Sequence, residues 1–372
     1  MLYKAIVIAA LTAAAVFSAC GGDTIDPPSA PPQLITDSVK MLGRTYYKND
    51  TLWCVHSGTG VEFSFTGTLS ITITGDSTAS RGDTHNQARI AIYENGERII
   101  DNMITKPEMV YTFVRSNNTV IKIVKLSESL MSFFGIKSIE CDGEIKPTQD
   151  KEMLIEFIGD SITCGYGIDA VYGTSSFSTT TEDFTKAYAY KTAELLDADY
   201  SVVALSGYGI ISGYTGGPIN STETMPQYYD KVGFSRGTVD GFIPSETAWD
   251  FSVRQPDIVV INLGTNDSSY CGSNAERRAA FTAGYEEFIN KVRSHNPDAL
   301  ILCMLGIMND NLFTPIQNAV VSFKLAGGSN ILTMKFDVQQ QSDGLATDYH
   351  PSATTNTKAA QKLAAFITQN LP

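Results

Sequence analysis

Between residues 34 and 146, short runs of the chain alternate apolar and polar residues. Such runs occupy residues 61–65, 69–73, 88–92 and 120–124. A period near two places the apolar side chains on one face of an extended strand. Asn95-Gly96 is a hairpin signal, and glycines punctuate the other runs. The pattern over 34–146 therefore predicts an all-β sandwich domain of the jelly-roll kind, with no helix of note.

After residues 146–150, which read as a linker, the pattern changes to nearly continuous apolar runs that alternate with helical stretches. Continuous runs indicate strands covered on both faces. The predicted strands are 154–158, 201–205, 258–263, 300–305 and 331–336, and the predicted helices lie near 183–196, 275–294, 314–325 and 354–369. This alternation predicts an α/β domain over 152–372, with a parallel sheet and helices on both faces.

The first residues of the chain resemble an export signal. Lys4 is followed by an apolar stretch at 5–17, which is shorter than the roughly 20 residues that cross a bilayer. Residues 1–19 are therefore expected to be a signal peptide. Ser18-Ala19-Cys20 resembles the bacterial lipoprotein cleavage motif, although a plain signal peptide with an incidental Cys is the alternative. A lipid on Cys20 would anchor an exported protein in the outer membrane or at the cell surface, with 20–33 as a Pro-rich tether.

Length and charge limit the function classes that fit this chain. A chain of 372 residues is long enough for two domains. Its formal net charge of −13 argues against nucleic acid as a partner, because binding phosphates requires clustered Lys and Arg. A neutral or weakly charged substrate fits better. No CxxC pair or His cluster in the sequence suggests a metal site, and no cofactor is expected.

Cysteine usage leaves the disulfide pattern open. If Cys20 carries lipid, the five remaining cysteines are an odd number, so at least one thiol is free. A bond between Cys164 and Cys271 could brace two loops, and one between Cys54 and Cys141 is also open. The cysteine at position 303 lies in an apolar run and is expected to be a buried thiol.

Polar residues that suit acyl transfer follow the predicted strands of the second domain. Ser161 comes directly after the first strand, and a serine becomes a good nucleophile only beside a base. Of the four histidines, His350 lies in the loop between the last strand and the final helix. Gly207 and Asn266 follow the second and third strands and, with the Ser161 N–H, offer three donors to an oxyanion. Because parallel strands end at one edge of the sheet, these groups are expected to meet.

These residues resemble a known family. Gly159-Asp160-Ser161, Gly207, Gly264-Thr265-Asn266-Asp267 and His350 are similar, in order, to the four blocks of the SGNH (GDSL-like) hydrolases. The resemblance covers 152–372 and implies a flavodoxin-like fold for this domain. Asp160 and Asp267 are expected to brace the loops rather than to perform chemistry.

At a finer level the chain resembles carbohydrate esterase family 2. The features that carry this are an N-terminal jelly roll, Met225-Pro226, Trp249-Asp250-Phe251 and residues 255–267. The resemblance implies metal-free removal of acetyl groups from xylan, glucomannan and related polysaccharides or oligosaccharides. Trp249 and Tyr270 are candidates for stacking on a sugar ring, although buried loop anchors use the same residue types. The β domain either binds glycan or walls one side of the cleft.

One departure from the family pattern concerns the acid of the catalytic triad. Most members place it three residues before the histidine, where this chain has Thr347, and the nearest acid is Asp348. Asp348 either orients His350 as a triad acid or shapes the loop while a main-chain carbonyl orients the histidine, as in some members. Two other functions stay open: a catalytically weak, glycan-binding surface lipoprotein, and an SGNH lipase or thioesterase that acts on longer acyl chains.

Overall fold

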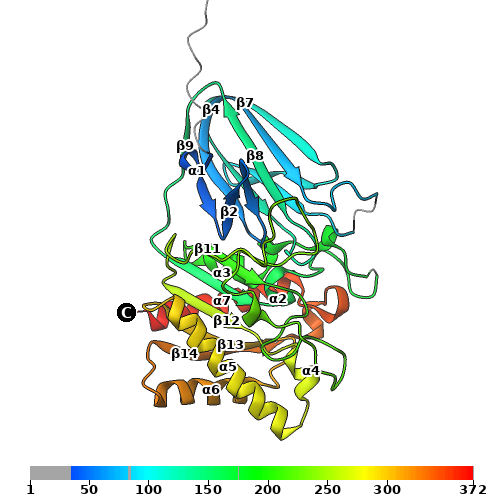
Figure 1. Cartoon of the computed structure of the whole chain (residues 1–372), viewed down its shortest axis with the longest axis vertical. Coiled ribbons are helices and arrows are strands. Elements are labelled where there is room, and N and C mark those ends of the chain that lie inside the picture. The colour runs from blue at the N-terminus through cyan, green and yellow to red at the C-terminus, as the bar shows by residue number, and fades with distance from the viewer. Residues whose placement is uncertain (1–34, 83–84, 175, 372) are drawn as a thin grey trace, which may run out of the picture. The chain divides into compact units, whose positions relative to one another are not determined.

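The computed structural model of the chain describes residues 35–82, 85–174 and 176–371 (Figure 1). By their contacts, Leu34–Pro372 make up a single unit. The predicted signal peptide, Cys20 and the tether lie outside the described residues. Among the described helices, none combines the length and apolar character that crossing a bilayer requires.

The first part of this unit is an antiparallel sheet, which follows the four-residue helix α1 (Ile35–Ser38). In the described residues its strands are β1 (Lys40–Leu42), β2 (Thr45–Lys48), β3 (Thr51–Cys54), β4 (Gly60–Gly75), β5 (Arg89–Glu94), β6 (Glu97–Met103), β7 (Glu108–Lys125), β8 (Phe134–Cys141) and β9 (Ile145–Pro147). They pair in the order β2-β3-β8-β4-β7-β5-β6, and β1 and β9 also pair with β4.

The long strand β4 lets this one sheet cover a core from two sides. Its first half pairs with β1 and β9 and its second half with β8, while β7 pairs with both halves. The register shifts at Thr66, where residues 116–118 of β7 stand opposite one residue of β4, and such bulges bend a strand. Val61 and Phe63 before the shift and Ile71 after it belong to one buried cluster. The predicted sandwich is confirmed, as one bent sheet around a common core.

The second part is the predicted α/β arrangement, and its sheet is parallel throughout (Figure 1). The strand order is β11 (Asp199–Ala204), β10 (Leu154–Gly159), β12 (Ile258–Asn262), β13 (Leu300–Ile307) and β14 (Ile331–Val338). In chain order this is 2-1-3-4-5, the flavodoxin-like order. The flavodoxin-like fold is therefore confirmed.

Helices cover both faces of the parallel sheet. The helices are α2 (Ser161–Cys164), α3 (Tyr188–Leu195), α4 (Asp267–Cys271), α5 (Ala275–His295), α6 (Phe313–Leu325) and α7 (Ala353–Asn370). Single turns of 3₁₀ helix lie at Thr179–Thr181, Phe184–Lys186, Met225–Gln227, Gln341–Asp343 and Thr347–Tyr349. Ile158 of β10 packs in the cluster that holds residues of α5 and α6, whereas its neighbour Phe157 packs with residues of α3 and α7. Successive side chains of the strand thus pack into the two hydrophobic clusters on opposite faces of the sheet.

A buried ion pair joins the antiparallel sheet to the parallel one. Arg44, between β1 and β2, donates to both carboxylate oxygens of Glu156 in β10, with Nη2 at 3.0 Å from Oε1 and 2.9 Å from Oε2. The two side chains are 0% and 6% exposed. Tyr229 and Ser201 also donate to this carboxylate through their hydroxyls. Buried charges are tolerated when they are paired and fully hydrogen-bonded in this way, so the contact fixes the β sheet against the strand that leads to Ser161.

Candidate active site

Ser161 begins a one-turn helix directly after β10. Asp160 precedes it in an extended conformation and accepts a hydrogen bond from the Ile162 amide at 3.0 Å, which caps the helix. Gly159 is required by this turn, because a Cβ there would lie 2.0 Å from the Thr163 Oγ1. The tight turn leaves Ser161 6% exposed, at the carboxyl end of a central strand.

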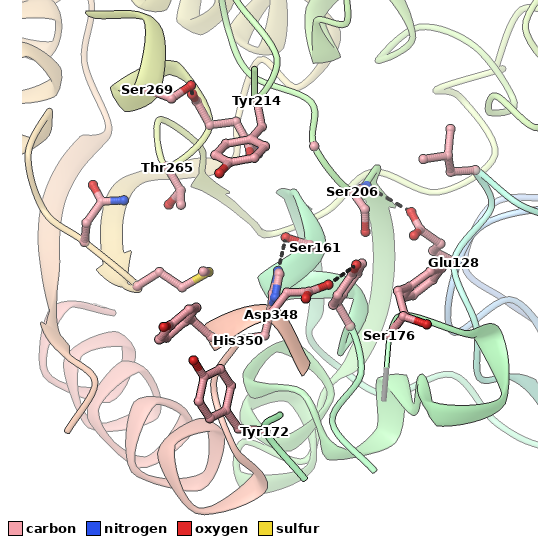
Figure 2. Close-up of a pocket in the computed structure, with 18 of the residues that line it drawn as sticks. Glu128, Ser161, Tyr172, Ser176, Ser206, Tyr214, Thr265, Ser269, Asp348 and His350 are labelled. Atoms are coloured by element: carbon pink, nitrogen blue, oxygen red, sulfur yellow. Dashed lines mark hydrogen bonds between the residues drawn. The ribbon is translucent and has the colours of Figure 1, made fainter. Parts of the chain in front are cut away.

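His350 meets Ser161 from the other end of the catalytic domain. Its Nε2 lies 2.7 Å from the Ser161 Oγ, and its Nδ1 lies 3.0 Å from the Thr347 carbonyl oxygen. Figure 2 shows the two side chains facing each other in the pocket. A carbonyl can only accept, so Nδ1 carries the proton and Nε2 is free to accept the serine proton. Ser161 and His350 are therefore arranged as a nucleophile and its general base.

The segment that carries His350 is held in place by α7 and by an aromatic ring. Near the start of α7, Asn356 accepts a hydrogen bond from the Tyr188 amide of α3 at 2.8 Å. Tyr166, in the loop after α2, stacks on the His350 ring with centroids 4.1 Å apart. These contacts bring the residues that follow β14, an edge strand, back to the end of β10.

In the described part of the chain, the Asp348 carboxylate makes no hydrogen bond to the His350 ring. Its carboxylate accepts from the Tyr166 hydroxyl at 2.9 Å. Asp348 and Tyr349 have positive φ angles of 51° and 63°, and this turn places the Thr347 carbonyl rather than the Asp348 carboxylate at Nδ1. The prediction of Asp348 as a triad acid is therefore wrong, and the alternative with a main-chain carbonyl describes the structure. The negative charge of Asp348 still acts on His350 through space.

The predicted oxyanion donors Gly207 and Asn266 differ in whether their N–H groups already have hydrogen-bond acceptors. Gly207 has a φ of 82° and open space around its Cβ position, and among the described residues its amide has no hydrogen-bond acceptor. The Asn266 Nδ2 already donates to the Tyr208 carbonyl at 2.8 Å and to Asp160 Oδ2 at 3.2 Å. Both amide protons are thus already engaged in the structure, whereas the Gly207 amide is free among the described residues.

Burial sets the protonation of this site. It lowers the pKa of His350 to about 4, although the Thr347 carbonyl and Asp348 oppose the shift. It raises the pKa of Asp160 to about 7, with help from the charge of Asp267, whose own pKa is raised to about 6. Asp267 accepts hydrogen bonds from the amides of residues 210–212. Both aspartates thus brace loops, as the sequence indicated.

Ser161 and His350 lie in the wall of a cavity of about 1170 Å³. Residues of both the antiparallel part and the parallel part of the unit line this cavity. Gly207 and Asn266 lie in its wall as well. The antiparallel part contributes the segment after β7, through Glu128, Leu130 and Met131. This agrees with the expectation that the β domain walls one side of the cleft.

Trp249 and Tyr270, the candidates for stacking on a sugar ring, lie outside this cavity. Trp249 packs on a buried cluster at the junction of the two parts, with the Arg44 guanidinium 5.5 Å from its ring. Tyr270 packs on the core beneath the sheet, 4.6 Å from Arg277. Both rings are half-buried, and Trp249 lines a separate cavity near β1 and β2 instead.

Other aromatic rings line the cavity in their place. They are Tyr166, Tyr172, Phe177, Tyr214 and Tyr349. Three of them belong to residues 166–177, an irregular stretch whose sequence has no periodicity to mark it. Of the other two, Tyr349 adjoins the predicted base and Tyr214 follows the predicted oxyanion donor Gly207, and these positions are the signals in the sequence that point to lining rings.

The five cysteines after Cys20 all have free thiols in the structure. The possible bond between Cys164 and Cys271 is not formed, because the two side chains pack in clusters on opposite faces of the parallel sheet. Cys54 and Cys141 are unpaired as well. Cys303 is buried as predicted, and burial raises its pKa to about 12. The described residues contain no group of three or more metal-ligating side chains.

Comparison with family models gives a match that covers more than half of the chain. The model described as the GDSL-like Lipase/Acylhydrolase family matches residues 157–357. The match begins in β10 and ends inside α7, and it includes every block that carried the sequence resemblance.

Several known proteins with similar sequence or structure are named as esterases that act on carbohydrates. Cellulase/esterase CelE of Acetivibrio thermocellus is 29% identical over 342 residues, which is 86% of this chain and 38% of that protein. An acetylxylan esterase / glucomannan deacetylase of Cellvibrio japonicus is 27% identical over 263 residues, 67% of this chain and 69% of that protein. A family two carbohydrate esterase from Clostridium thermocellum, solved in complex with cellohexaose, has a TM-score of 0.76 at 26% identity, over 89% of this chain and 98% of that one. The resemblance to family 2 is confirmed.

The lowered pKa of His350 predicts an unusually acidic limit to activity. Only the neutral imidazole accepts the Ser161 proton, so kcat/KM should stay level down to about pH 5 and fall about tenfold per unit below pH 4. An inflection near about 6.5, the ordinary histidine value, would contradict this. Because Asp160 titrates near neutrality, the profile should be repeated with Asp160→Asn, which keeps the helix cap, and circular dichroism should show that the protein stays folded.

The geometry at Asp348 predicts a mild effect of its substitution. Asp348→Asn keeps an acceptor for the Tyr166 hydroxyl and leaves the Thr347 carbonyl on His350. We expect kcat on 4-nitrophenyl acetate to fall by less than about tenfold, whereas loss of a true triad acid costs about four orders of magnitude. His350→Ala is the matched comparison and should lose nearly all turnover. If Asp348→Asn loses nearly as much kcat as His350→Ala, Asp348 acts as the triad acid and this account of the site is wrong.

Proposed function

Because the chain belongs to the GDSL-like Lipase/Acylhydrolase family, we propose that it is a serine esterase that removes O-acetyl groups from plant cell-wall polysaccharides such as xylan or glucomannan. The observation that carries the proposal is the hydrogen bond of 2.7 Å between the Ser161 Oγ and the His350 Nε2. It lies in the cavity wall beside the Gly207 amide, which has no acceptor among the described residues.

The geometry supports a two-step acyl transfer. Ser161 attacks the acetyl carbonyl while His350 takes its proton, and the Thr347 carbonyl stabilises the imidazolium through Nδ1. The N–H groups of Ser161 and Gly207, with the Asn266 amide, stabilise the oxyanion. His350 then gives the proton to the departing sugar oxygen, and an acetyl group remains on Ser161. Water, deprotonated by His350, releases acetate and restores the serine.

Relatives and cavity shape support a carbohydrate ester as substrate. The relatives are named as acetylxylan esterase, glucomannan deacetylase and carbohydrate esterase. The cavity is wide and has aromatic rings together with Ser, Thr and Asn side chains in its wall, which suits stacking on sugar rings and hydrogen bonding to their hydroxyls. The chain spans 38% of CelE and about two thirds of the Cellvibrio protein, so the substrate is inferred for this chain and is not transferred from the whole relatives.

The intact site favours this function over the two alternatives. A glycan-binding lipoprotein with a decayed site would not need Ser161 in contact with His350, which the structure retains. A lipase or thioesterase needs an extended apolar groove for its acyl chain, whereas polar side chains such as Thr265 and Ser268 belong to the wall of the cavity that holds Ser161.

We also propose that the protein is an exported lipoprotein that reaches its polysaccharide at the outer membrane or cell surface. The support is the sequence alone: an apolar stretch at 5–17 followed by Ser18-Ala19-Cys20. Mass spectrometry of the protein from the membrane fraction should find Cys20 as an acylated N-terminus, and Cys20→Ser should release the protein from that fraction. An unmodified Cys20 in an exported, soluble protein would favour the plain signal peptide.

A comparison of esters tests the proposed activity and its alternatives together. Wild type should hydrolyse acetylated xylan or glucomannan and 4-nitrophenyl acetate, with kcat/KM falling as the acyl chain lengthens. Ser161→Ala should lose several orders of magnitude of kcat on each, because the nucleophile is gone. Faster hydrolysis of long acyl esters would favour a lipase or thioesterase, and binding of glycan without turnover would favour the lipoprotein alternative.

A further inference from the structure

Glu128 is a fully buried carboxylate that the antiparallel part of the unit places beside the catalytic cavity. It lies three residues beyond the end of β7 and is 0% exposed. Its Oε2 accepts a hydrogen bond from the Ser206 amide at 2.9 Å, and Figure 2 shows this contact to the right of Ser161. Its other oxygen, Oε1, has no partner among the described residues. A buried carboxylate with an unused acceptor is costly to retain for stability alone.

The Ser206 amide is next to the group that the proposed mechanism needs. Ser206 and Leu205 connect the end of β11 to Gly207, whose N–H has no acceptor among the described residues and is the proposed oxyanion donor. The Ser206 hydroxyl has no hydrogen-bond partner in the described part of the chain. The bond to Glu128 is therefore the polar contact that fixes the Ser206 N–H, and with it the direction from which the chain enters Gly207 at its φ of 82°.

Glu128 is itself held at both ends of its main chain. Its amide donates to the Glu182 Oε2 at 2.9 Å, and its carbonyl accepts from the buried Lys125 ammonium at 2.7 Å. Lys125 donates to the Ser127 carbonyl as well. The side chains of Glu128, Glu182 and Lys125 are each 0% exposed. These hydrogen bonds hold the main chain of the segment after β7 in place. A side chain that positions another group needs such support.

We propose that Glu128 is a positioning residue that orients the Gly207 oxyanion donor through the Ser206 amide, so that the β domain supplies part of the catalytic geometry. The inference rests on the proposed esterase function. It goes beyond the role of the β domain as a wall, because it predicts an effect on the transition state rather than on binding alone.

Four variants test the proposal through kcat and KM on 4-nitrophenyl acetate, with the melting temperature of each measured in parallel. Glu128→Ala removes the contact to Ser206, and Glu128→Gln keeps an acceptor of the same shape. Glu182→Ala disturbs the same segment at the Glu128 amide and leaves the Ser206 contact. Glu140→Ala is the control, since this glutamate is exposed on β8.

We expect Glu128→Ala to lower kcat by about 10- to 100-fold with little change in KM, less than the loss of about 10²- to 10³-fold for a whole oxyanion donor. Glu128→Gln should keep kcat within about threefold of wild type, because the acceptor is conserved. Glu182→Ala should lower the melting temperature with a much smaller effect on kcat. Glu140→Ala should match wild type in both. If Glu128→Ala fails to fold, Glu128→Asp takes its place: its shorter side chain draws the acceptor away from the Ser206 amide, so the same fall in kcat is expected.

Two outcomes would overturn the inference alone. One is an active wild type with kcat unchanged in Glu128→Ala. The other is an equal loss in the Glu128 and Glu182 variants that follows their melting temperatures, including a loss in Glu128→Gln as large as in the alanine variant. A wild type that does not hydrolyse acetyl esters would instead overturn the proposed function, and the inference with it.

Discussion

The contact between the Ser161 hydroxyl and the His350 imidazole, 189 positions apart in the chain, constrains everything around the site. It requires that residues beyond an edge strand return to the end of β10, and the sheet order alone does not achieve this. The return is made by α7, which packs against α3, and by the stacking of Tyr166 on the imidazole. The same turn presents the Thr347 carbonyl to Nδ1. A carbonyl orients the ring and fixes its tautomer without adding a second charge to a buried site.

The antiparallel sheet enters this arrangement through two buried polar links. The Arg44–Glu156 pair fixes it to β10, which leads to the nucleophile, and the Glu128–Ser206 contact fixes it to the residues after β11, which lead to the oxyanion donor. Both carboxylates are removed from water, so each link is stable only while its partners are in place. The two strand ends that carry Ser161 and Gly207 therefore depend on the β domain for their support, and the two parts of the chain act as one catalytic unit.

The sequence predicted the elements of the fold because burial on both faces leaves a strong pattern in strands such as Ile258–Asn262, and it placed Ser161, Gly207, Asn266 and His350 at one edge because parallel strands end together. Other features depend on tertiary contacts that no local pattern encodes. The helix predicted from 183 begins at Tyr188, because Asp183 caps a separate 3₁₀ turn. Trp249 stacks with Arg44 rather than lining the cavity, and Glu128 reads in the sequence as an ordinary loop acid until the fold brings it to Ser206.

The central claim is that Ser161, activated by His350, carries the acyl group during turnover. Acid quenching of the enzyme in the first turnovers of 4-nitrophenyl acetate, followed by peptide mapping with mass spectrometry, tests this most directly. The account predicts one acetyl group per molecule, on the peptide that contains Ser161. An acetyl group on another residue during turnover, or rapid turnover with no acetylated protein under conditions where deacetylation limits the rate, would contradict it.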